Sequence, residues 1–203
     1  MKRVYFDLET SGLSPYSEIT QIAAIAVDWH TSEKSVFETK LKFDVERANE
    51  RALEINHYSP EAWADAPAQA KGLELFANFL RNHTTLKKYS KRGNIYMVAQ
   101  LVGHNAAAFD FPILSNSFRR NKLFLPADYH IRDTLQLAFI YSDLLGVAFD
   151  DYKLVTFAKY FNCLEDNAHD ALVDVKMCAE IDRCMMQSLS DRLESAQVEA
   201  CQI

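Results

Sequence analysis

Two carboxylates stand two residues apart in the first apolar segment of the chain. Asp7 and Glu9 alternate with Phe6 and Leu8 in residues 3–9, a pattern that predicts a β-strand. Side chains two apart on a strand project to the same face, so both carboxylates share one face. Such a pair is repulsive, and a hard cation compensates for the repulsion. The spacing indicates either a metal site or two solvated acids at an exposed strand end.

A third acid lies where a buried strand meets a helix, in the segment GHNAAAFDFP at 103–112. Pro112 fits only the first turn of a helix, so the helix cannot begin much before Ala108. Asp110 then lies in or beside that turn, where the helix dipole favours its ionised form. Ordinary compensation of the helix terminus is the alternative role.

The segment HDALVD at 169–174 adds a histidine and a fourth acid. At 100° per residue His169 and Asp174 lie about 140° apart and cannot share a helical face. A chemical role for both requires His169 at the helix entrance and Asp174 a turn inside, leaning back toward the N-terminus. Asn167 is the predicted N-cap, with Asp170 at N3. The alternative is a solvated helix with ordinary caps.

Together these segments resemble the DEDDh, or DnaQ-like, family of 3′→5′ exonucleases. The order is D-x-E, then H-N-x-x-x-F-D, then H-x-x-x-x-D, and the resemblance covers residues 3 to about 185. Residues 56–67 (NHYSPEAWADAP) are similar to the family segment between the first two motifs. The sister family with Y-x-x-x-D does not fit, because position 170 is Asp.

The resemblance implies an α/β domain with a ribonuclease H-like mixed five-stranded sheet, the first three strands antiparallel, flanked by helices. It implies two divalent metal ions, Mg²⁺ or Mn²⁺, held by Asp7, Glu9, Asp110 and Asp174, with Asp7 bridging. His169 is the expected general base, and an unperturbed imidazole pKa of ~6.5 suits that role near neutral pH.

The same resemblance points to substrate contacts just after the first motif. Thr10, Ser11 and Leu13 are the positions where the family presents backbone amides and an apolar wedge to the terminal nucleotide. Asn105 and His57 are candidates for contacts with the nucleic-acid backbone or sugar.

Aromatic side chains near these motifs are candidates for stacking on bases, which tolerates any sequence. They are Tyr58, Phe109 and Phe111, with core packing as the alternative for at least one phenylalanine. His104 is expected to be structural. The basic runs within 87–92 and 119–122 are the best local candidates for attracting phosphate, and solvated loop charge is the alternative for the first.

Periodicity and turn residues predict the elements that position these groups. The expected strands are 3–9, 18–29, 35–43, 95–104 and 129–133, with a turn at 30–33 and a basic loop at 87–94. Helices are expected within 48–82, starting near Pro60 and Pro67, and at 108–121, 134–146, 152–161 and 168–189.

Composition is that of an ordinary globular protein, with 203 residues, 49% of them hydrophobic and 25% charged. We expect one exonuclease domain over 1–203, with a core at about 3–187 and a helical extension or tail at 188–203. The net charge of −6 argues against coating nucleic acid by bulk charge, though not against a local basic groove. Four cysteines without C-x-x-C spacing indicate free thiols. Without a signal peptide or an apolar span, a cytoplasmic protein without membrane contact is expected.

These features predict a metal-dependent 3′→5′ exonuclease that releases nucleoside 5′-monophosphates from single-stranded DNA ends by a two-metal-ion mechanism. A 3′→5′ exoribonuclease of the oligoribonuclease type is the alternative, because the residues that read the 2′-OH are not identified. A catalytically silent nucleic-acid-binding domain is the alternative from another class, and the presence of all four acids and His169 argues against it. A protein partner or a homodimer stays open.

Overall fold

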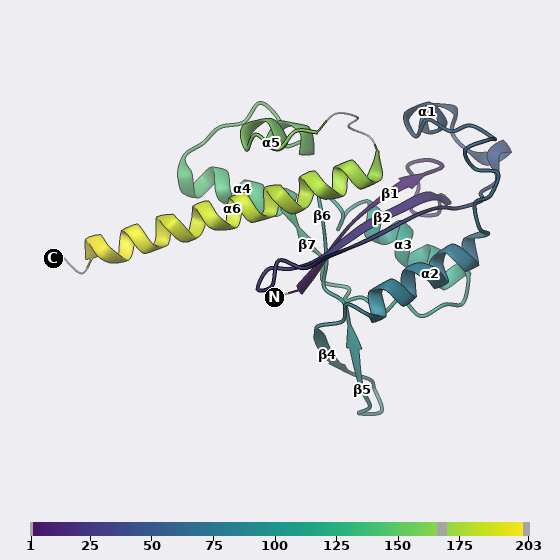
Figure 1. The fold of residues 1–203 in the computed structure, drawn as a ribbon, viewed down its shortest axis with the longest axis horizontal. Helices are drawn as coiled ribbons and strands as arrows, with labels where there is room; N and C mark the ends of the chain where they lie inside the picture. The colour runs from purple at the N-terminus through teal and green to yellow at the C-terminus, as the bar shows by residue number, and fades with distance from the viewer. Residues whose placement is uncertain (1, 166–169, 201–203) are drawn as a thin grey trace.

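A mixed five-stranded sheet forms the centre of the molecule (Figure 1). The structure, a computed structural model, describes residues 2–165 and 170–200, with side chains to residue 195. The strand order is β3-β2-β1-β6-β7, from β1 (Lys2–Thr10), β2 (Ile19–Asp28), β3 (Lys34–Lys40), β6 (Leu101–Gly103) and β7 (Arg132–Asp133). The first three strands are antiparallel neighbours, and β6 and β7 continue the sheet in parallel. The predicted fold class is confirmed.

Helices cover both faces of this sheet. They are η1 (Val45–Arg47), α1 (Glu50–Ile55), α2 (Gln69–Arg81), α3 (Asp110–Arg120), α4 (Thr134–Leu145), α5 (Leu154–Tyr160) and α6 (Ala171–Ala200). On one face, the core joins β1 and β2 to α2 and α3 through residues such as Phe6, Phe76 and Ile113. On the other, Tyr5 and Val175 belong to the cluster that joins the sheet to α6, and α4 and α5 pack on α6 from outside.

Strand alternation assigns each β1 side chain to one of these two layers. Phe6 and Leu8 lie in the α2–α3 layer, whereas Tyr5 lies in the α6 layer. Asp7 and Glu9 have the parity of Tyr5, so both carboxylates project toward the side that α6 covers.

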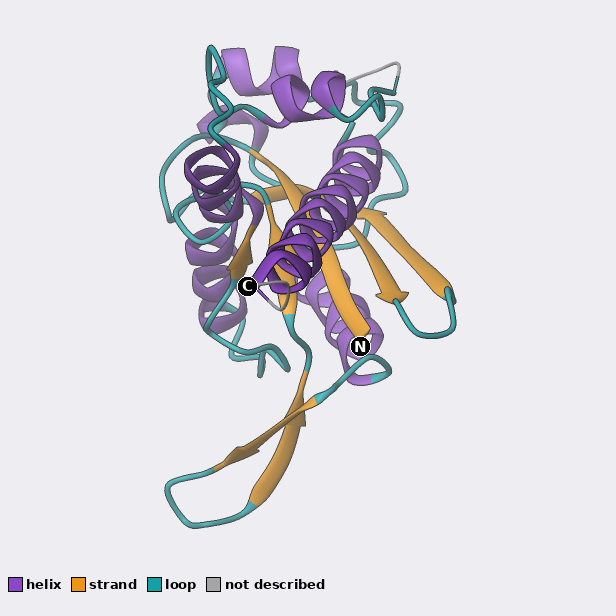
Figure 2. Ribbon diagram, turned by 90° about the vertical axis from the view of Figure 1, so that its left-hand side faces the viewer, coloured by secondary structure: helices purple, strands orange, loops and turns teal. Residues whose placement is uncertain are grey.

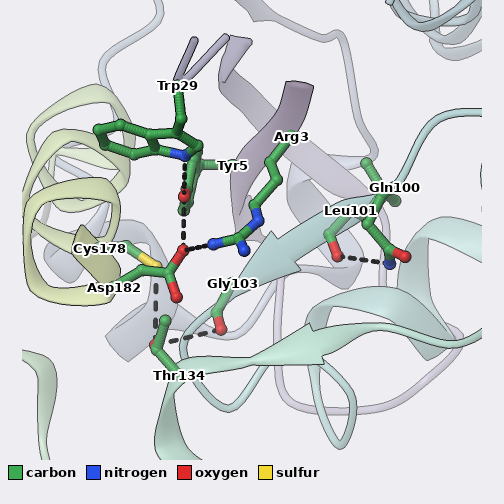
Figure 3. A network of polar contacts seen from close by, with 9 residues as sticks. All are labelled: Arg3, Tyr5, Trp29, Gln100, Leu101, Gly103, Thr134, Cys178 and Asp182. Carbon is green, nitrogen blue, oxygen red and sulfur yellow. Dashed lines mark hydrogen bonds and ion pairs between the residues drawn. The ribbon is translucent and has the colours of Figure 1, made fainter. Parts of the chain in front are cut away.

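A buried polar network ties α6 to the start of the sheet (Figure 3). The Asp182 carboxylate accepts hydrogen bonds from Arg3 Nη1 and from the Tyr5 hydroxyl, each at 2.5 Å. Trp29 Nε1 donates to the Tyr5 oxygen at 3.0 Å. Burial, together with the Asp182 charge, raises the pKa of Tyr5, so the phenol stays a donor. This network fixes the rotation and height of α6 relative to β1.

The segment between α2 and β6 differs from the prediction. Instead of a basic loop at 87–94 and one buried strand at 95–104, the chain forms a separate hairpin of β4 (Leu86–Tyr89) and β5 (Ile95–Val98). Residues 95–98 pair with 86–89 across the turn, and only Leu101–Gly103 enters the main sheet. The predicted helix start near Pro60 is also wrong, because residues 60–65 form turns.

Helix α6 continues past the body of the protein as far as Ala200 (Figure 1). Within the described residues, no helix has both the length and the apolar character needed to cross a bilayer. The predicted free thiols are seen at Cys163, Cys178 and Cys184, and Cys201 lies outside the described residues.

Candidate active site

Two of the predicted metal ligands lie at the carboxyl end of β1. Asp7 pairs with Ala23 and Glu9 with Gln21 in regular antiparallel register with β2, and the register shifts directly after Glu9. Both acids are partly exposed, in contrast to the buried Leu8 between them. The regular register keeps both carboxylates on one face up to the point where the strand irregularity begins.

Asp110 is the first residue of α3 and is 4% exposed. Its Oδ1 accepts the backbone N–H of Leu8 at 3.2 Å, which places the carboxylate directly beside β1 between Asp7 and Glu9. Phe109, the N-cap residue, provides no side-chain cap. The predicted position of Asp110 in the first helical turn is therefore confirmed, with a contact to β1 that explains its burial.

Asp174 lies in the first turn of α6. Asp170 is the residue that caps this helix, since its Oδ1 accepts the N–H groups of Leu172 at 3.0 Å and Val173 at 3.3 Å. The prediction of Asp170 at N3 is therefore wrong, because the helix begins at Ala171 and Asp170 is its N-cap. The predicted cap Asn167 and the predicted general base His169 lie outside the described residues.

The carboxylates influence one another electrostatically. Burial, followed by the charges of Asp110, Glu9 and Asp174, raises the pKa of Asp7 well above its usual value. Burial and the charges of Asp174, Asp110 and Asp170 raise the pKa of Glu9 to about 8. Burial also raises the pKa of Asp110 to about 7, against the opposing effect of the Leu8 N–H. The fold thus concentrates negative charge in a poorly solvated place.

The donor set fits a divalent cation. Hard ions such as Mg²⁺ and Mn²⁺ take carboxylate oxygens, and a positive charge offsets both the burial of these carboxylates and the repulsion between them. Among the residues that the structure describes, however, no three Asp, Glu, His or Cys side chains are already arranged as a metal-binding group. The cluster supplies the donor atoms and the negative charge that such an ion requires.

Asp133, which the sequence motifs do not single out, connects the start of α4 to the loop before Asp110. Its carboxylate accepts the backbone N–H groups of Asn105 at 2.8 Å and Ala107 at 3.0 Å, and also that of Leu135 at 3.0 Å. One side chain thus caps α4 and fixes the loop that leads into Asp110. The signal available in the sequence was an Asp directly before the predicted helix at 134, which is a typical N-cap.

Gly103 lets this loop pass close to β1. A Cβ built at Gly103 would lie 2.4 Å from the Ala106 Cβ and 3.1 Å from the backbone oxygen of Phe6. Both distances are shorter than ordinary contacts. Glycine is therefore required where the loop turns from β6 toward Asp110.

The predicted substrate residues after the first motif adjoin a cleft of about 730 Å³. It is lined by residues of 11–18 and 44–49 together with Arg120. Thr10 and Ser11 are nearly buried, and Leu13 is 86% exposed. Arg120 donates to the carbonyl oxygens of Tyr16 and Ser17, so this member of the basic run at 119–122 holds the cleft loop in place.

The other predicted contacts occupy varied environments. Tyr58 packs between the rings of Phe43 and Trp63, with both centroid distances 5.2 Å. His57 and Asn105 are exposed and adopt positive φ angles of 49° and 58°.

The aromatic candidates in the second motif pack partly against the protein. Phe109 and Phe111 are half-buried against the α2–α3 core. His104 is bonded through both ring nitrogens, to Thr134 Oγ1 and to the carbonyl oxygen of Tyr152, each at 2.9 Å. This geometry is that of a structural histidine, as expected.

The sequence as a whole matches the exonuclease family RNase T over residues 4–181. The chain therefore belongs to this family of DnaQ-like exonucleases, and the expected enzyme class, a 3′→5′ exonuclease domain, is confirmed at that level. It is 28% identical over 190 residues to a PolC-type DNA polymerase III of Caldanaerobacter subterraneus subsp. tengcongensis. That alignment covers 93% of this chain and 12% of the polymerase, so the chain spans a small part of that relative.

Solved structures with the same fold include Escherichia coli exonuclease I in complex with a dT13 oligonucleotide. Its TM-score is 0.72 at 20% identity, over 96% of this chain and 43% of exonuclease I. Cell-death related nuclease 4 has a TM-score of 0.71 at 16% identity, over 92% of this chain and 64% of that protein. Both similarities support the ribonuclease H-like arrangement of sheet and helices.

Proposed function

We propose that this chain is a metal-dependent 3′→5′ exonuclease that removes nucleoside 5′-monophosphates from single-stranded DNA. The observation that carries the proposal is the cluster of Asp7, Glu9, Asp110 and Asp174 at the carboxyl end of β1, in which burial and the charges of the neighbouring acids raise the pKa values of Asp7 and Glu9. Hydrolysis of a phosphodiester requires positive charge at the reacting phosphate. Four clustered carboxylates are suited to hold the divalent cations that would supply this charge.

Each residue then has a defined task. Asp7, Glu9, Asp110 and Asp174 would hold two Mg²⁺ or Mn²⁺ ions, and His169 would accept the proton of the attacking water. When bound, such ions supply an activated nucleophile and countercharge for the leaving oxygen. The Leu8 N–H keeps Asp110 oriented, and Asp133 fixes the loop that precedes it.

The proposal of single-stranded DNA as the substrate is supported by the loop that follows Glu9 and by the proteins that this chain resembles. Leu13 is exposed beside the cleft and would form the apolar wedge, with Thr10 and Ser11 presenting backbone groups to the terminal nucleotide. Exonuclease I has been solved with dT13 and dA16 oligonucleotides and in a complex with single-stranded DNA, and the PolC-type relative is a DNA polymerase. These relatives favour DNA over RNA as the substrate.

The test is digestion of 5′-labelled DNA and RNA 15-mers of matched sequence with Mg²⁺, with products sized on a gel. We expect a ladder that shortens from the 3′ end, faster on DNA, and lost in chelator or in Asp7→Ala. Asp143→Ala, which removes an exposed carboxylate of α4, is the matched control and should retain full activity. A clear preference for RNA would refute the substrate assignment, and nucleotide release by Asp7→Ala would refute the metal-site roles.

A further inference from the structure

The hairpin of β4 and β5 projects from the body of the protein, as Figures 1 and 2 show. Within the described part of the chain its strands pair only with each other, from Leu86 opposite Val98 to Tyr89 opposite Ile95. An isolated two-stranded hairpin is marginal in water, so an apolar face on it calls for an explanation. Tyr89, Ile95 and Met97 are 64%, 58% and 44% exposed, although they lie at strand positions where apolar residues are usually covered.

The hairpin is also strongly basic in an acidic protein. Between Glu74 and Asp110 the sequence has no acidic residue, yet residues 87–92 contain three lysines and one arginine in a chain of net charge −6. Lys88 forms an ion pair within the protein, with its Nζ 2.7 Å from Asp128 Oδ2. Lys87, Lys91 and Arg92 are exposed, and no ion pair joins them to an acid of the described residues.

The turn presents two of these cations in a fixed way. Ser90 N donates to the Asn94 oxygen at 2.8 Å, and Gly93 N donates to the Ser90 oxygen at 2.9 Å. Gly93 has φ of +80°, which glycine adopts without strain. Lys91 and Arg92 therefore lie at the tip of a closed turn.

Aromatic rings alternate with the cations on this part of the surface. Lys87 Nζ lies 5.4 Å from the centroid of Tyr89, and Lys88 Nζ lies 5.7 Å from that of Tyr129. Tyr129 is 70% exposed. Rings that stack on bases beside cations that contact phosphates are the combination by which proteins hold single strands without sequence preference. An acidic peptide would use the cations but would not account for the exposed rings.

The hairpin and the carboxylate cluster lie at opposite ends of the sheet. Strand β6 runs parallel to β1 with Leu101 opposite Val4, so the hairpin precedes the start of the sheet whereas Asp7 and Glu9 lie toward its end. Five residue rises along β1 and at least four along the hairpin, at about 3.3 Å each, separate Glu9 from the hairpin tip by about 30 Å. At the rise of about 3.4 Å per nucleotide of a fully stacked strand, this distance corresponds to at most about nine nucleotides, and to fewer in an extended single strand.

We propose that the β4–β5 hairpin is a second binding surface for single-stranded nucleic acid, which holds the strand at a distance from the 3′ end being hydrolysed. This inference rests on the proposed function in one respect: the strand that the hairpin binds is taken to be the strand that the active site hydrolyses. It predicts that long strands bind through both ends of the molecule, and that strands too short to reach the hairpin bind through the active site alone.

The experiment measures the binding of a fluorescent 25-mer of single-stranded DNA in EDTA over a range of salt concentrations. In K87Q/K91Q/R92Q we expect at least tenfold weaker binding near 0.1 M salt and a salt-dependence slope smaller by about 2, since each phosphate contact to a single strand contributes about 0.7. Tyr89→Ala should weaken binding about tenfold by loss of stacking, while Tyr89→Phe should bind as the wild type does.

A matched control and a short substrate separate this proposal from the proposed function. K34Q/K71Q/K159Q removes three exposed cations elsewhere and should leave 25-mer binding unchanged. Cleavage of a tetranucleotide with Mg²⁺ should be equal in the wild type and in the hairpin variant. Unchanged 25-mer affinity and salt slope in K87Q/K91Q/R92Q would overturn the hairpin proposal, and would leave an acidic protein as the occupant of this surface. A wild-type protein that binds the 25-mer through the hairpin and cleaves nothing would contradict the proposed function alone.

Discussion

Replacing Asp110 with asparagine should stabilise the protein while abolishing its activity. The pKa of this carboxyl is raised from 3.8 to about 7, mainly by burial, so the folded state is penalised for carrying the ionised form. Three pKa units correspond to about 4 kcal/mol as an upper limit, at about 1.36 kcal/mol per unit. Loss of the favourable helix-dipole interaction subtracts about 0.3–1 kcal/mol. The amide oxygen of asparagine can still accept the Leu8 N–H. We therefore expect Asp110→Asn to be more stable at pH 8 by up to about 3 kcal/mol.

The sign of this effect fixes its pH dependence. When the pKa of a carboxyl is higher in the folded than in the unfolded state, the protein loses stability as the pH rises from the unfolded-state pKa to the folded-state pKa. The gain in Asp110→Asn should therefore be absent below about pH 4, increase up to pH 7 and stay constant above it. Urea denaturation in EDTA at pH 5 and pH 8 measures it, with Asp143→Asn as a control that should show no such gain. An Asp110→Asn variant no more stable than the wild type at pH 8 would refute the reasoning.

Three further substitutions test the elements that position the site. Gly103→Ala should cost about 1–3 kcal/mol in urea denaturation, because its Cβ would lie 2.4 Å from that of Ala106; a cost below about 0.5 kcal/mol would contradict the required close approach. Asp182→Ala should cost about 3–5 kcal/mol, because it leaves the buried Arg3 guanidinium without its carboxylate, and a thermal shift within error of the wild type would disprove that dependence. Asp133→Ala should reduce the cleavage rate at least tenfold at saturating substrate, because the loop before Asp110 loses two hydrogen bonds; an unchanged rate would rule out this positioning role.

The elements that carry the acids can be predicted because each has a strong local signal. Alternation defines β1, and with it the shared face of Asp7 and Glu9. Pro112 restricts where α3 can begin, and so places Asp110 in its first turn. The family motifs then supply the order of the strands, which periodicity alone does not determine.

Two other features of the structure do not follow from the local sequence patterns. The first strand of the hairpin falls in the segment predicted as a basic loop, because Lys87 and Lys88 leave Leu86 and Tyr89 without an apolar alternation. The strand predicted at 95–104 is divided, because residues 95–98 pair with 86–89 instead of joining the main sheet. The role of Asp133 comes from a loop about thirty residues earlier, which no local pattern reveals.

The central claim is that the carboxylates at the end of β1 share divalent cations on which the reaction depends. Calorimetric titration of the protein with Mn²⁺ tests it most directly, in the wild type, in Asp7→Asn and in the exposed-acid control Asp143→Asn. The account predicts two Mn²⁺ per chain for the wild type and the control, and loss or strong weakening of binding in Asp7→Asn. Unaltered Mn²⁺ binding by Asp7→Asn, or no binding by the wild type, would contradict it.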